Sequence, residues 1–121
     1  MKQIIAVSVV RFNNQYSQDI TCFEPNADTP IEIIKSALTE HFEKIKNQII
    51  SPCTEHYEYG ESDGHEDDRK HTHSFVIRAI KNAKSLSDLH GHWSLEDGVD
   101  IDTDEQIFSH ITVSAATLKK L

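Results

Sequence analysis

Apolar residues recur along the chain with two different periods, and these periods predict its secondary structure. Over residues 30–50 they recur every three or four positions, which places them in one stripe along a helix. The residues of this stripe are Ile31, Ile34, Leu38, Phe42, Ile45 and Ile49. Pro52 follows and cannot continue a helix. The pattern therefore predicts a long amphipathic helix over 30–50.

Other segments have the shorter period, or the residue types, of β-strands. Residues 3–12 are rich in β-branched side chains on both faces, which is typical of a central strand covered on both sides. Residues 19–24 follow a turn-rich connector and complete a hairpin. Residues 71–81 are expected to form a third strand and residues 106–116 a last one. Residues 82–98 fit either a short helix or a strand around Trp93.

This order of elements predicts an α+β fold. We expect one domain over residues 1–121, since this length can bury one ordinary core without metals or disulfides. The expected architecture is an antiparallel or mixed sheet of four to five strands, with the 30–50 helix packed on one face. The connections at 54–70 and 96–105 are expected to be acidic loops, and they would form one acidic patch if both emerge at the same end of the sheet.

Charge is concentrated in two short segments. The chain has a formal net charge of −8, and residues 54–68 and 96–105 hold thirteen of its 20 acidic residues without a single Lys or Arg. A nucleic-acid-binding protein would carry the opposite charge, so we expect no direct contact with DNA or RNA. No apolar run approaches the ~20 residues of a membrane span, and we expect a cytoplasmic protein.

These acidic segments suggest a protein–protein interface. A dense carboxylate surface can occupy the positive groove of a nucleic-acid-binding protein and compete there with phosphates. We therefore expect a small non-enzymatic inhibitor, immunity or anti-defence module with a basic protein partner. Its expected contact residues are Glu55, Tyr57, Glu58, Tyr59, Glu61, Asp63, Glu66, Asp67, Asp68, Trp93, Glu96, Asp97, Asp100, Asp102, Asp104 and Glu105. A plain solvated surface that keeps the protein soluble is the alternative.

The histidines suggest a competing function, a divalent-metal-binding protein or small metallohydrolase. Two His-x-His pairs, His71/His73 and His90/His92, would each place both imidazoles on one face of a strand. Together they could supply four nitrogen ligands to zinc. No cofactor other than zinc is suggested by the sequence.

Three further observations bear on chemistry and assembly. His92 and His110 each begin a His-x-Ser/Thr motif, "HWSL" and "HITV", that resembles the signature of two-histidine phosphoesterases, although the 18-residue spacing is far shorter than in that family. Cys22 and Cys53 are too few for a disulfide framework and are expected to be reduced. The apolar hairpin edge would invite self-association, so a homodimer is a third alternative.

Overall fold

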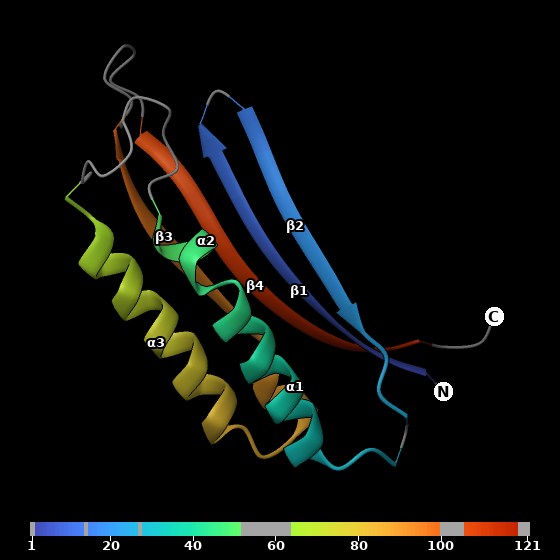
Figure 1. Cartoon of the computed structure of the whole chain (residues 1–121). Coiled ribbons are helices and arrows are strands. Elements are labelled where there is room, and N and C mark those ends of the chain that lie inside the picture. The colour runs from blue at the N-terminus through green and yellow to red at the C-terminus, as the bar shows by residue number, and fades with distance from the viewer. Residues whose placement is uncertain (1, 14, 27, 52–63, 100–105, 119–121) are drawn as a thin grey trace.

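The computed structural model describes residues 2–13, 15–26, 28–51, 64–99 and 106–118. They form an α+β fold in two layers, a sheet with all the helices on one of its faces (Figure 1). The strands are β1 (Lys2–Asn13), β2 (Gln15–Phe23), β3 (Gly91–Val99) and β4 (Gln106–Leu118). The helices are α1 (Ile31–Lys44), α2 (Lys46–Ile50), α3 (Glu66–Asn82) and the 3₁₀ helix η1 (Leu86–Leu89).

The sheet is antiparallel throughout, with the strand order β2-β1-β4-β3. The expected hairpin is formed by β1 and β2, and β1 is a central strand as predicted. The expectation of cover on both faces is wrong, because the helices lie on one face only (Figure 1). Since β1 pairs on both sides, it also offers no free edge for self-association; the edge of the hairpin is β2.

The hydrophobic core lies between the sheet and the helices. Alternate residues of β1 point into it, and their neighbours at Ile111 and Val113 on β4 do the same. The core side chains of β1 are Ile5, Val7 and Val9. From the helices come Ile34, Leu38, Phe42, Ile45, Ile49, Val76, Ile77 and Ile80. The apolar stripe predicted for residues 30–50 is thus the stripe that packs on the sheet.

The helix expected over 30–50 is divided at Ile45. Ile45 has φ −95° and ψ 9°, so α1 ends there and the short α2 starts at Lys46. The carbonyl of Phe42 lies one turn before this break and accepts a hydrogen bond from His73 Nε2 at 2.9 Å. The break therefore leaves a buried carbonyl that a side chain of another helix satisfies.

The strand expected over 71–81 is wrong, because these residues belong to α3. The buried positions of α3 are Arg69, His73, Val76, Ile77 and Ile80, which follow the helical period of three and four. Phe75 lies on the other side and is 54% exposed. The alternating series His73, Phe75, Ile77, Ala79 suggested a strand, but residues 66–68 place three acids in the first helical turn, where the helix dipole favours them.

Residues 82–98 contain both of the expected structures, first a short helix and then a strand. The η1 helix occupies Leu86–Leu89, and β3 begins at Gly91. Trp93 packs against the core from β3, and its ring lies over Gly91. A Cβ atom added to Gly91 would lie 2.0 Å from the Trp93 ring, so this position excludes a side chain.

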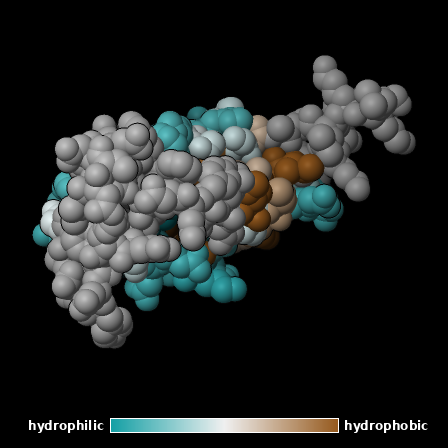
Figure 2. All heavy atoms as spheres, turned by 90° about the horizontal axis from the view of Figure 1, so that it is seen from above, coloured by the Kyte–Doolittle hydropathy of each residue, from teal (hydrophilic) through white to brown (hydrophobic). Residues whose placement is uncertain are grey.

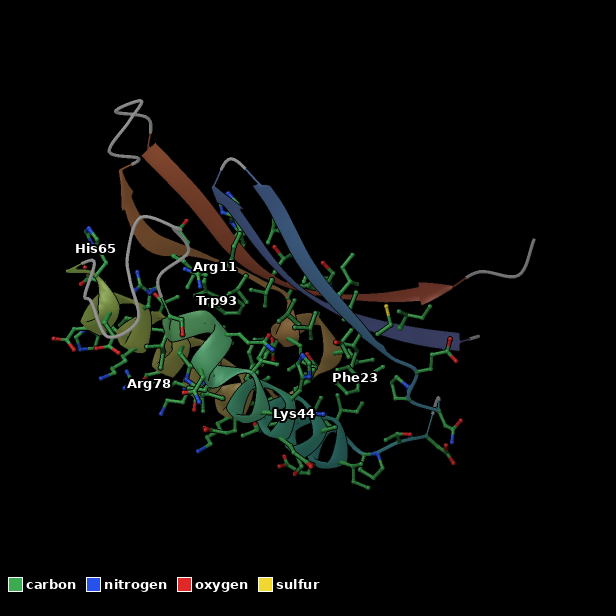
Figure 3. All side chains as sticks on the ribbon, turned by 45° about the horizontal axis from the view of Figure 1, so that its top comes forward. Arg11, Phe23, Lys44, His65, Arg78 and Trp93 are labelled. Carbon is green, nitrogen blue, oxygen red and sulfur yellow. The ribbon has the colours of Figure 1, made fainter. Side chains whose placement is uncertain are left out.

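Two buried arginines hold the C-terminal end of α2. Arg11 projects from β1 toward the helices (Figure 3) and donates to the carbonyls of Gln48 at 2.8 Å and Ser51 at 2.6 Å. Arg69, which is 0% exposed, donates from Nε to the carbonyl of Ile50 at 2.5 Å. These carbonyls have no further helical turn to bond with, and they form the negative end of the helix, so guanidinium groups suit them.

We predict that Arg69→Met lowers the free energy of unfolding by about 2–4 kcal/mol, because it removes a buried charge-assisted donor and leaves the Ile50 carbonyl unsatisfied. Arg78→Met is the matched control, since Arg78 is exposed on the same helix; it should change stability by less than about 0.5 kcal/mol. Urea unfolding followed by circular dichroism measures both. Equal effects of the two substitutions would contradict this role of Arg69.

Asp88, in η1, is the described group with the clearest pKa shift. The backbone N–H of Lys84 donates to Asp88 Oδ2 at 3.0 Å, and this bond lowers the pKa of Asp88 below its ordinary value of 3.8. The ionised form is favoured in the folded state, so its contribution to stability is present above the unfolded-state pKa and is lost as pH falls through the folded-state pKa. An NMR titration should find a midpoint for Asp88 below 3.8; a midpoint at or above this value would refute the assignment.

Candidate functional site

The candidate interface is the end of the molecule from which both acidic segments leave. The structure describes part of each segment and the chain beside it, up to Ser51 and from Gly64 for the first segment, and up to Val99 and from Gln106 for the second. In Figure 1 all of these chain ends lie at the same end of the sheet. The Thr72 hydroxyl donates to the carbonyl of Asp68 at 3.1 Å and lies 3.4 Å from the carbonyl of Ser94, so the first half of α3 lies beside β3. The fold thus directs both segments from one side of the molecule.

Three of the expected contact residues are the first three residues of α3. Glu66, Asp67 and Asp68 are all exposed. Asp68 lies 3.4 Å from His65 Nδ1, and Glu66 lies 3.9 Å from Lys70 Nζ. Such exposed pairs contribute little to stability, because water screens them on every side. Their carboxylates are therefore accessible to a partner.

Most of the other expected contact residues cannot be placed. Glu55, Tyr57, Glu58, Tyr59, Glu61, Asp63, Asp100, Asp102, Asp104 and Glu105 lie outside the described residues. Glu96 and Asp97 lie in β3 next to a register shift between Glu96 and Val99. Trp93 sits on the helix-covered face of the sheet, half-buried against the core (Figure 3). Its expected role as a contact residue for the partner stays a prediction.

A groove on the outer face of the helices is lined by basic side chains. Between α2 and α3 lies a groove of about 320 Å³ that includes Lys46, Arg78 and Lys81 along its walls. The buried His73 and the exposed Glu43 also line it. Figure 3 shows Arg78 on this outer helical side, away from the sheet. Three basic side chains thus line this groove.

The four histidines expected to bind zinc do not share one face. In α3 a two-residue step turns a side chain by about 200°, so His71 is exposed while His73 is buried. The Nε2 atom of His73 is already engaged with the Phe42 carbonyl. Among the residues that the structure describes, no group of three or more His, Cys, Asp or Glu could hold a metal ion. The strand geometry that motivated this site is therefore absent for His71 and His73.

A different histidine pair comes together on the uncovered face of the sheet. His92 of β3 and His110 of β4 have ring centroids 4.8 Å apart with planes inclined by 35°. His92 pairs with Thr112, and Ser94 pairs with His110, so the two His-x-Ser/Thr motifs lie antiparallel beside each other. His90 lies outside this pair, and its Nδ1 accepts a bond from the Ala115 N–H at 3.4 Å.

The sequence analysis missed two buried arginines and one histidine pair. The position of each arginine in the pattern of buried residues could have revealed it. Arg11 continues the alternating series Ile5, Val7, Val9 and so falls on the core face. Arg69 lies one turn before His73 on the buried side of α3. The proximity of His92 and His110 required the pairing register of β3 and β4, which no single strand reveals.

The chain matches no protein-family model, no curated protein and no solved structure in the comparisons made. None of the described helices is long and apolar enough to cross a membrane.

The difference between His73 and His71 gives a direct test of the helical assignment. We predict that His73→Leu destabilises the protein by about 1–3 kcal/mol, because the buried carbonyl of Phe42 loses its donor. His71→Leu, two residues away and exposed, should change stability by less than about 0.5 kcal/mol. Thermal or urea unfolding measures both. Similar effects for the two residues would instead fit the strand, in which they share a face.

Proposed function

We propose that this protein binds a basic, nucleic-acid-handling protein through its acidic end and acts as an inhibitor or immunity-type module. The observation that carries the proposal is the common origin of the two acidic segments at one end of the sheet (Figure 1). Thirteen of the 20 acidic residues belong to these segments, so they hold most of the negative charge of the chain.

The chemistry of such a surface suits a partner that normally binds phosphates. Carboxylates that extend from one end of a protein can enter a groove lined by Lys and Arg, and they displace the same counterions that a nucleic acid would displace. Long-range attraction would speed the encounter, and association would weaken as salt is added.

The test compares two triple variants with the same change in charge. Glu66→Gln, Asp67→Asn and Asp68→Asn neutralise the acids at the start of α3, where the acidic segment ends. Glu32→Gln, Glu40→Gln and Glu43→Gln neutralise three exposed acids of α1. Each triple variant also loses one ion pair within its own helix. This pair is Glu66–Lys70, at 3.9 Å, in the α3 variant and Glu32–Lys35, at 3.6 Å, in the α1 variant. The α3 variant also loses the contact of Asp68 with His65.

The expected result is loss of the bound partner from the first triple variant alone. Immobilised wild-type protein and both variants would be incubated with lysate of the source cells, and retained proteins would be identified by mass spectrometry across a salt series. Wild type and the α1 variant should retain the same basic protein, which is released as salt rises. Equal retention by the two variants, or a retained protein that does not respond to salt, would refute the acidic interface.

A further inference from the structure

The uncovered face of the sheet carries a second candidate site that does not depend on the acidic end. Its residues are His92 and Ser94 on β3, and His110 and Thr112 on β4. His92 and Ser94 are exposed, whereas His110 and Thr112 are half-buried. All four lie on the face opposite Trp93, Leu95 and Ile111, which pack with the core.

We propose that His92 and His110 form a two-imidazole chelating site for one divalent transition-metal ion, such as Zn²⁺ or Ni²⁺. Two nitrogen ligands of a tetrahedral zinc ion lie roughly 3.4 Å apart, given Zn–N bonds of about 2.0–2.1 Å. Ring centroids at 4.8 Å allow this separation when the nitrogens turn toward each other. His92 is exposed, so its ring is free to make this rotation.

The surroundings of His110 determine which of its nitrogens can act. Its Nδ1 atom is buried and has no hydrogen-bond partner. Leaving Nδ1 unprotonated avoids burying an unpaired N–H group, so the neutral ring carries its proton on Nε2. A neutral imidazole binds a metal ion through its unprotonated nitrogen, so Nδ1 is the ligand atom of His110, and the ring keeps its proton on Nε2.

The charge of the protein favours a cation over a phosphate at this pair. The chain has a net charge of −8, and the described side chains of this face include no Lys or Arg that could bind a phosphate. Imidazole is a preferred ligand of zinc, copper and nickel, whereas calcium and magnesium prefer oxygen. Ser94 and Thr112, each opposite one of the histidines, place hydroxyl groups or their bound waters beside the remaining coordination positions.

Isothermal titration of untagged protein with ZnCl₂ and with NiCl₂ tests the site. Wild type should bind one ion in a saturable manner. His92→Gln should weaken this binding by about 100-fold, because a single imidazole loses the advantage of the second ligand held nearby. His110→Gln should have the same effect, with its fold checked by circular dichroism. His71→Gln is the matched control, since His71 is exposed on α3, and it should bind like wild type.

A second measurement identifies the ligand atoms. NMR of the imidazole nitrogens should show that zinc shifts the Nδ1 resonance of His110 together with a resonance of His92, while His71 stays unchanged. Failure to saturate by about millimolar metal, or binding by His92→Gln as tight as that of wild type, would overturn the proposal. The acidic-end variants should bind metal normally, so failure of this site and failure of the proposed function are distinguishable.

Discussion

The arrangement of the helices depends on four backbone carbonyls that the helices cannot satisfy themselves. Phe42, at the break between α1 and α2, and Gln48, Ile50 and Ser51, at the end of α2, present these acceptors. Leaving such groups unpaired in a buried place costs roughly 1–3 kcal/mol each. The donors are side chains of β1 and α3: Arg11, Arg69 and His73. The apolar core packs the two layers together, and these bonds satisfy the carbonyls that remain where Pro52 ends α2.

This polar cluster also determines where the first acidic segment begins. It fixes Ser51 through Arg11, and Arg69 lies just after the acids at the start of α3. Two buried guanidinium groups therefore lie close to the points where the acidic segment leaves and rejoins the fold. Their positive charge complements the negative end of α2. The electrostatics of the fold and those of the proposed interface are thus connected at Ser51 and at the start of α3.

The sequence predicted the α+β fold, the hairpin, the core helix and the last strand, because each has a strong period of its own. It failed at residues 71–81, where Phe75 and Ala79 completed an alternating series that competes with the helical series Arg69, His73, Val76, Ile80. Arg69 and His73 are buried but count as polar in any hydrophobicity pattern, so the pattern did not show the buried face of α3. The His92–His110 pair was equally hidden, because cross-strand neighbours depend on register rather than on spacing along the chain.

The pairing of β1 with β4 has a consequence for how the protein is made. It joins the first strand to the last, from Lys2 opposite Leu118 to Arg11 opposite Ser109, and it lies at the centre of the sheet. On the ribosome, β1 and β2 can form their hairpin early, but the centre of the sheet stays open until β4 has been synthesised. Contacts this distant in sequence must overcome a large loop-closure entropy, which makes folding slow. The nascent chain must therefore keep the apolar face of β1 from other partners until β4 can pair with it.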